Sequence, residues 1–323
     1  MRQYDFPVRV CAFALPLLWL SGCGGAKTSS SPTAGAGSSF GQAGSVSILT
    51  GNGGAASSSG GAGSVNAGAL PPGFTAANTF GGFKLGDPIS ASTSGGATGA
   101  AGGTTTDGCG TTILAVIRDF QPDGKNFEAN IGDDKNLVKA ALGADRKPVF
   151  APSGPTNTVQ DTAQFDDWYR NTDGLNMPFK LELWFGPNNG VSSFQSTAFF
   201  PLDGQGYGNQ GKDDSGTPHN FFFTTEIHTE FKYNGGEKFN FTGDDDVWVF
   251  VNNQLALDLG GVHAAENGSI DIDAQAGTLG LTVGNVYPFD MFQNERHTTQ
   301  SNFRADTDLE FVDCGTIVPD VPR

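Results

Sequence analysis

Positive charge is scarce in this 323-residue sequence. It has 18 Lys and Arg against 34 Asp and Glu, which gives a formal net charge of −16 at pH 7. Proteins that bind nucleic acids need basic patches to contact the phosphates, so a nucleic acid partner is excluded. The sequence also lacks a basic amphipathic helix, so we expect membrane contact only through a lipid anchor.

Long apolar runs are missing too. The most prominent one, residues 10–20, has about 11 residues, whereas a bilayer core of about 30 Å needs roughly 20. It follows two arginines and closes on Leu20-Ser21-Gly22-Cys23, the pattern of a secretory signal peptide with a lipoprotein cleavage site. We predict removal of residues 1–22 and attachment of diacylglycerol and palmitate to Cys23. An ordinary signal peptide with a chance cysteine is the alternative.

The residue after this cysteine is Gly24 and not aspartate. This arrangement resembles that of lipoproteins sent onward to the outer membrane of a Gram-negative bacterium. We therefore expect export across the inner membrane and lipid anchoring at the outer membrane or the cell surface.

Charge is nearly absent from residues 24–106, where Gly, Ala, Ser and Thr dominate. Such a segment cannot bury enough apolar surface to offset the entropy lost on ordering. We predict a disordered linker over residues 23–108, with a root-mean-square span on the order of 50 Å. That span is long enough to carry a domain clear of a membrane.

Cysteine and histidine are rare, with four of each. Cys11 leaves with the signal peptide and Cys23 is the acylation site, so Cys109 and Cys314 remain. In an oxidising compartment these two could form a disulfide that joins the ends of one domain. Two buried free thiols are the alternative. The four histidines lack the close spacing of a zinc site.

Residues 109–316 have the length and pattern of one all-β domain, followed by a tail at 317–323. Helical signals are confined to residues 133–143 and 165–169. Parallel α/β folds need many crossover helices, so a β-sandwich with loop insertions and one or two short helices is left. The predicted strands are residues 111–118, 179–185, 221–227, 230–233, 247–251, 254–259, 270–273, 279–283, 286–292 and 303–311.

Three adjacent aspartates, Asp244, Asp245 and Asp246, directly precede residues 247–251. That run is apolar on both alternating faces, which is typical of a strand buried within a sheet core. Three like charges beside a rigid strand repel one another. A hard divalent cation such as calcium, bound by oxygen ligands at about 2.3–2.6 Å, compensates them. We therefore predict a calcium site here, with a solvated acidic turn as the alternative.

A tight hairpin follows the triplet. Asn252-Asn253 separates two apolar runs and tolerates the positive φ of a two-residue turn. Antiparallel pairing about this turn folds Asp258 and His263 back beside the three aspartates. A later loop, residues 293–302, carries Glu295, Arg296 and His297.

Several ordered motifs resemble one family. They are residues 165–170, 219–221, 241–250, 258–263 and 295–304, and together they are similar to the fibro-slime domain over nearly all of residues 112–312. That domain belongs to the wider PA14-like group of β-sandwich or β-barrel modules, which includes carbohydrate-binding adhesin domains. In the sugar-binding members, two aspartates joined by a cis peptide hold a calcium ion that contacts sugar hydroxyls. The resemblance assigns these roles to Asp244 and Asp245, and this chain has Asp246 where relatives often have glycine.

The expected function is a surface-tethered module that binds a polysaccharide or other glycan and is not an enzyme. The expected ligand-binding residues are Asp258, His263, Glu295, Arg296, His297 and Asn302. A structural or signalling module that binds a protein partner is the alternative. Glycoside hydrolysis is disfavoured, because adjacent carboxylates on one strand point to opposite faces, whereas catalytic pairs face each other about 5–10 Å apart.

Overall fold

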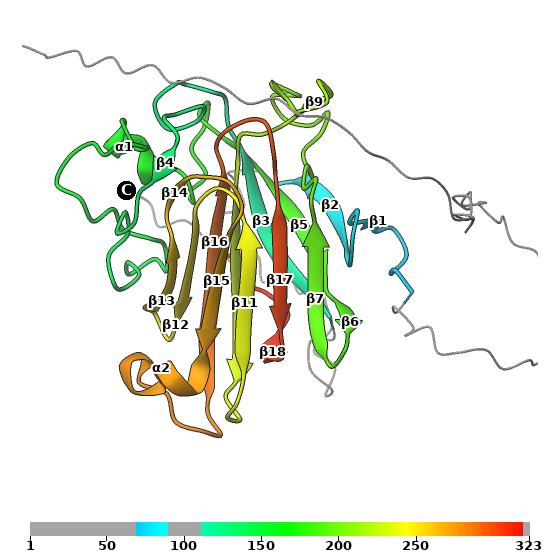
Figure 1. The fold of residues 1–323 in the computed structure, drawn as a ribbon, viewed down its shortest axis with the longest axis vertical. Coiled ribbons are helices and arrows are strands. Elements are labelled where there is room, and N and C mark those ends of the chain that lie inside the picture. Colours follow the sequence, from blue (N-terminus) through cyan, green and yellow to red (C-terminus); the bar gives the residue numbers. More distant parts are fainter. Residues whose placement is uncertain (1–68, 90–110, 319–323) are drawn as a thin grey trace, which may run out of the picture. The chain divides into compact units, whose positions relative to one another are not determined.

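In a computed structural model of the protein, the structure describes residues 69–89 and 111–318 (Figure 1). Strands dominate these ranges, and the two helices in them are short: α1 is Thr162–Phe165 and α2 is Ile272–Leu279. None of the helices there is long and apolar enough to cross a membrane. The all-β prediction with one or two short helices is confirmed. The predicted signal peptide and Cys23 lie outside the described residues.

Two antiparallel sheets form the framework. The larger one has the order β1-β2-β5-β3-β10-β16-β12-β13, with β18 also paired to β10. Its strands are β1 (Thr75–Ala76), β2 (Gly82–Pro88), β3 (Thr112–Asp119), β5 (Met177–Trp184), β10 (Phe223–Lys232), β12 (Val247–Val251), β13 (Gln254–Leu259), β16 (Val286–Glu295) and β18 (Glu310–Asp313).

The smaller sheet has the order β15-β11-β17-β7-β6. Its strands are β6 (Gly186–Asn188), β7 (Val191–Ser196), β11 (Lys238–Gly243), β15 (Glu266–Asp271) and β17 (Phe303–Thr307). Two short ladders complete the set: β4 (Gly132–Asp133) pairs with β14 (Gly261–Val262), and β8 (Gly211–Lys212) pairs with β9 (Pro218–His219).

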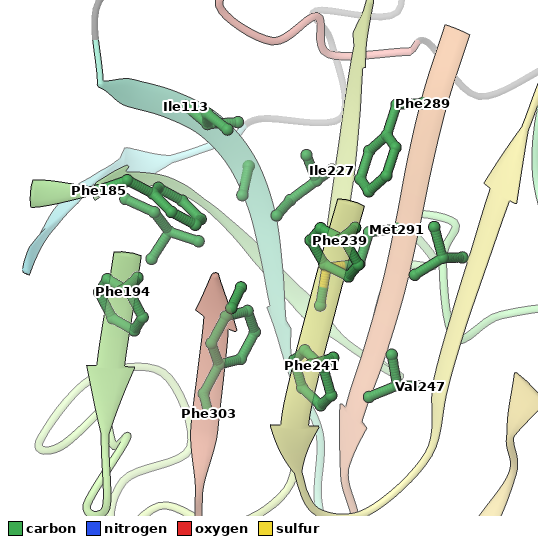
Figure 2. Close-up of a cluster of buried hydrophobic side chains, with 14 of the residues drawn as sticks. Ile113, Phe185, Phe194, Ile227, Phe239, Phe241, Val247, Phe289, Met291 and Phe303 are labelled. Carbon is green, nitrogen blue, oxygen red and sulfur yellow. The ribbon is translucent and has the colours of Figure 1, made fainter. Parts of the chain in front are cut away.

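The main core lies between the two sheets. Ile227 and Met291 project from the larger sheet and meet Phe241 and Phe303 from the smaller one (Figure 2). Alternate residues of each strand face this space, as the two-residue period of a strand requires. This packing of two facing sheets is the predicted sandwich.

A second apolar cluster covers the other face of the larger sheet. The segment 120–176 supplies Phe127 and Trp168 to it, and the sheet supplies Trp248, Phe250 and Phe292. Strand β12 therefore has apolar neighbours on both faces, and all five of its residues are buried. The prediction of a doubly buried strand at residues 247–251 is confirmed.

The predicted linker, residues 23–108, is wrong for residues 75–88. Strand β2 adds to the edge of the larger sheet by pairing with β5. Phe83 and Leu85 pack against the main core, and Lys84 Nζ lies 2.9 Å from Glu182 Oε1. Two apolar side chains in a low-complexity segment are enough to order it when an open sheet edge is available.

Three secondary-structure predictions are wrong, one of them in part: residues 270–273 are strand only to Asp271, because α2 begins at Ile272. Residues 133–143 form β4, turns and isolated bridges instead of a helix, because long-range partners hold their polar groups: Asp134 accepts from Thr158, and the Asn136 amide donates to Asp258. Residues 279–283 are not a strand. Helix α2 ends at Leu279, and Gly280 at φ 69° forms its left-handed cap.

The second helical prediction, residues 165–169, falls on the end of a helix. Helix α1 ends at Phe165, and turns follow it. The predicted hairpin is confirmed: β12 and β13 pair about Asn252 and Asn253, whose φ values are 51° and 61°.

Candidate functional site

The three aspartates form the crossing from one sheet to the other. Strand β11 of the smaller sheet ends at Gly243, and β12 of the larger sheet begins at Val247. Asp244, Asp245 and Asp246 fill the gap and are all buried. The peptide bond between Asp244 and Asp245 is cis, as the family resemblance implied.

Asp244 is held by a single neighbour from the loop before β17. Both the backbone amide and the side-chain amide of Asn302 donate to its carboxylate, the latter at 2.7 Å. Asn302 is partly exposed. Asn302, one of the predicted ligand-binding residues, therefore lies beside Asp244, and its role in ligand binding stays a prediction.

Asp245 joins the hairpin to the end of β16. Its Oδ1 accepts from the His263 backbone amide at 3.0 Å, and its Oδ2 accepts from the Arg296 backbone amide at 3.0 Å. Each oxygen has one hydrogen bond, although a carboxylate oxygen can accept two. Both oxygens therefore keep a free lone pair for a further ligand.

Asp246 has a different role. Its Oδ2 accepts from Arg296 Nε at 2.6 Å and its Oδ1 from the Gly261 amide at 2.7 Å. Arg296 also donates to the carbonyls of Asn126 and Thr158 and lies 4.8 Å from the Trp168 ring centroid. Asp246 and Arg296 thus form a buried ion pair that supports the site, and we leave Asp246 out of the metal ligands.

Glu295 lies beneath the aspartate pair. It is fully buried, and neither of its carboxylate oxygens has a hydrogen-bond partner in the part of the chain that the structure describes. The Ser301 hydroxyl and the His297 amide lie near it, but neither bonds it with regular geometry, and Ser301 donates to the Phe199 carbonyl instead. Burying a carboxylate without partners costs free energy, which makes Glu295 an unusual feature beside the aspartate pair.

The pKa values of Glu295, Asp245 and Asp244 reflect their burial and their few hydrogen-bond partners. Burial raises the pKa of Glu295 well above its usual range, and the charges of Asp245 and Asp244 raise it further. Burial also raises the pKa of Asp245 strongly, although Arg296 opposes this, and it raises the pKa of Asp244 against the hydrogen bonds from Asn302. A bound cation would reverse these shifts by favouring the charged forms.

Two predicted ligand-binding residues do not contact the pair. Asp258 accepts from Trp248 Nε1 and from the amides of Gly260 and Asn136, so it fixes the hairpin. The His297 ring bonds the Thr298 carbonyl and lies 3.6 Å from Glu128. His263 reaches Asp245 through its backbone, while its ring lies near the carbonyls of Ala264 and Leu259.

Glu128 is a neighbour of the site that the sequence did not reveal. Its carboxylate accepts from the Thr298 backbone and hydroxyl, and its own amide donates to the Arg296 carbonyl at 2.6 Å. It comes from the segment 120–176, some 170 positions from its partner in the sequence. No local pattern around Glu128 could have shown this contact.

The aromatic residues that could stack on a sugar ring are mostly inaccessible. Trp168, Tyr169 and Trp184 are buried and belong to the packing, whereas Tyr207 is partly exposed. The structure describes only one cysteine of the predicted disulfide. Cys314 is disulfide-bonded, and Cys109 lies outside the described residues. The pairing of these two cysteines stays a prediction.

The donor set can be compared with the needs of calcium. Within residues 69–89 and 111–318, no group of three or more His, Cys, Asp or Glu side chains is arranged to hold a metal by itself. Asp244 and Asp245 offer carboxylate oxygens with free lone pairs beside an amide side chain, Asn302. Hard oxygen ligands with open positions fit calcium, whose remaining positions neutral oxygens can fill.

Comparisons with known proteins agree with the wider family. Residues 203–322 match the model of the PA14 domain. The PA14 part of the resemblance is confirmed over these residues, and the fibro-slime assignment stays a prediction. The crystal structure of the PA14 domain of the antifreeze protein MpAFP is similar at 9% identity with a TM-score of 0.29, covering 66% of this chain and 95% of that domain.

Curated relatives are found in Dictyostelium discoideum. Protein psiR is 41% identical over 214 residues, which is 62% of this chain and 21% of psiR. Protein psiQ is 40% identical over 225 residues, which is 63% of this chain and 22% of psiQ. This chain therefore spans about a fifth of the length of these relatives.

Proposed function

We propose that this protein is a calcium-dependent glycan-binding module that a lipid anchor displays at a bacterial cell surface. PA14 domains are known for carbohydrate binding and adhesion. The observation that carries the proposal is the excess of buried carboxylates at the sheet crossing. Asp244, Asp245 and Glu295 have no paired side-chain cation among the described residues, since Arg296 pairs with Asp246.

The hydrogen bonding of the aspartate pair supports a proposed ligand set. Asp244 and Asp245 would hold the ion, and Asn302 lies beside them with a partly exposed side chain. A bound calcium ion supplies open coordination positions for vicinal sugar hydroxyls, which are neutral oxygen ligands. Asp246, Arg296 and Glu128 keep the surrounding loops in place and contact no ligand.

Calorimetry with calcium and a panel of polysaccharides tests this proposal. We expect calcium binding in the wild type and glycan binding that EDTA abolishes. Asp244→Ala and Asp245→Ala should each lower calcium affinity at least about 100-fold with a folded far-ultraviolet spectrum retained, because each removes a charged ligand. Binding of neither calcium nor any glycan would contradict the proposal and favour a protein partner.

The anchor needs its own experiment. Metabolic labelling with a palmitate analogue in a Gram-negative host should mark the wild type and leave Cys23→Ser unlabelled. Equal labelling of both proteins would contradict lipid attachment at Cys23, without affecting the proposed glycan site.

A further inference from the structure

Two side chains near Glu295 also have a buried polar atom without a hydrogen bond. Gln293 Oε1 and Thr225 Oγ1 are also buried without hydrogen-bond partners. In the pairing of β10 with β16, Thr225 lies opposite Gln293 and Phe223 lies opposite Glu295. Phe223 and Met291 belong to the main core, so these alternate positions face the space between the sheets.

The space between the two sheets beside Glu295 has many hydrogen-bond acceptors and few donors. Glu295 contributes two carboxylate oxygens and Gln293 one amide oxygen, and none of them receives a hydrogen bond. The Gln293 amide nitrogen is used elsewhere, since it donates to the Asp244 carbonyl at 3.1 Å. The Gln293 side chain therefore connects this space directly to the aspartate pair.

The nearest fixed cation does not compensate Glu295. Arg296 follows it in the chain, but its guanidinium points to Asp246 and to the carbonyls of Asn126 and Thr158. Beta-strand alternation explains this, because consecutive side chains point to opposite faces. Glu295 is thus left on the inner face with Asp244 and Asp245 as its charged neighbours.

We propose that Glu295 is a positioning residue for the cation: a buried carboxyl group without a hydrogen-bond partner among the described residues, which weakens the metal-free protein and strengthens cation binding at Asp244 and Asp245. This inference rests on the proposed function. Glu295 acts on the ion through the aspartate pair and is not itself a ligand. A divalent ion at the pair places positive charge over all three carboxylates, so part of the binding energy comes from relief of their repulsion.

The variant Glu295→Gln distinguishes an effect of the carboxyl group on cation binding from an effect of side-chain packing. It keeps the shape of the side chain, removes the charge, and adds an NH2 group that can donate to the acceptors in this space. In EDTA, the Tm of Glu295→Gln should exceed that of the wild type by about 2–8 °C. Calcium affinity should fall about 10- to 100-fold, the usual range for groups that support metal ligands.

Glu237→Gln is the matched control. Glu237 is a buried glutamate whose oxygens accept from the backbone amides of Asn234 at 2.5 Å and Gly235 at 2.9 Å. This variant loses a satisfied acceptor, so its Tm should fall in EDTA and its calcium affinity should stay at the wild-type value. The two glutamates are thus expected to respond to the same substitution with opposite signs.

The outcomes are distinguishable. A Glu295→Gln protein with unchanged calcium affinity, or with a Tm in EDTA no higher than that of the wild type, overturns the inference and leaves the proposed function intact. A wild-type protein that binds no calcium contradicts the proposed calcium site itself. That failure is visible in the wild-type titration before any variant is compared, and it removes the inference as well.

Discussion

Two buried acidic clusters lie on opposite faces of the sheet at strand β16. They differ in the number of cationic side chains that pair with them. On the outer face, Glu226 and Asp290 are surrounded by cations: Arg118 Nη1 lies 2.6 Å from Glu226, Arg146 Nη2 lies 2.5 Å from Asp290, and Lys147 also pairs with Glu226. On the inner face, Glu295 at the end of β16 and its neighbours Asp244 and Asp245 have no ion pair with a side-chain cation within residues 69–89 and 111–318.

Histidine completes the outer cluster. His228 Nδ1 lies 2.6 Å from Asp290 Oδ1, and its Nε2 pairs with Glu226. Burial alone would raise the pKa of Glu226, but Lys147 and Arg118 outweigh it and hold that pKa well below the usual range. The inner carboxyl groups of Glu295 and Asp245 have raised pKa values at similar burial.

The difference shows that burial alone does not set the direction in which the pKa of an acidic group shifts. Neighbouring cations decide that direction. Each carboxylate of the outer cluster forms ion pairs within the chain, although Asp290 Oδ2 and Arg146 Nε have no hydrogen-bond partner among the described residues. We interpret this cluster as a structural attachment of segment 120–176 to the sheet. The inner cluster has no such ion pair within residues 69–89 and 111–318, and under the proposed function a bound cation would supply the positive charge. The predictions below separate these two cases.

The largest effect should come from the outer cluster. Glu226→Gln leaves Arg118 and Lys147 buried without their carboxylate, and breaking a buried pair in this way costs about 3–5 kcal/mol. Urea unfolding followed by tryptophan fluorescence measures it. A loss below about 1 kcal/mol would mean that the outer cluster is not balanced as described.

A second substitution removes the one fixed cation near the inner cluster. Arg296→Met should destabilise the protein by about 2–4 kcal/mol in EDTA, because Asp246 loses its buried partner. Saturating calcium should restore part of this loss, since the ion also acts on the neighbouring carboxylates. Unfolding curves with and without calcium provide the comparison, and an equal loss in both would argue against coupling between Arg296 and the ion.

A third prediction concerns Asp119, a buried carboxyl group that has hydrogen-bond partners but belongs to neither cluster. Burial raises its pKa to about 6 from 3.8, while the side chain of Asn220 and the amide of Tyr207 oppose the shift. The folded state therefore binds the proton more tightly than the unfolded state. The resulting stability is present below about pH 4 and is lost as the pH rises to about 6, by up to about 3 kcal/mol.

The difference between wild type and Asp119→Asn isolates this contribution. The variant cannot titrate at this position, so its free energy of unfolding should fall less steeply between pH 4 and 6. Denaturant titrations at a series of pH values measure both slopes. Identical slopes would show that Asp119 has an ordinary pKa in the folded protein.

The smallest effect is expected at the surface. Lys238 Nζ lies 2.6 Å from Asp271 Oδ2, but both side chains are largely exposed. Water and salt screen such pairs, so Lys238→Ala should leave the free energy of unfolding almost unchanged. A loss as large as that of Glu226→Gln would undermine the distinction between buried and exposed pairs.

The sequence predicted the parts of this molecule that depend on local patterns. Alternation and β-branched runs located β5, β12 and β16, and Asn252-Asn253 located the hairpin. The acidic triplet was located by its place before a doubly buried apolar run, and the family resemblance singled out Asp244 and Asp245. The contact of Asn302 with Asp244 was not predicted.

What the sequence did not predict depends on distant partners. Residues 133–143 carry helical signals, yet bonds to Thr158 and Asp258 hold them in another conformation. Glu128 reaches the site from far along the chain. The structural role of Asp246 was hidden as well, because three equivalent aspartates in a row say nothing about which one Arg296 will pair with.

Thermal denaturation of the wild-type protein in EDTA and in calcium tests the central claim most directly. If the inner cluster awaits a cation, calcium at about 100 times its dissociation constant should add about 2.7 kcal/mol of stability. For a domain of this size that corresponds to a rise in Tm of about 5–10 °C. Asp245→Ala should show no rise. An unchanged wild-type Tm across the calcium titration would contradict the account.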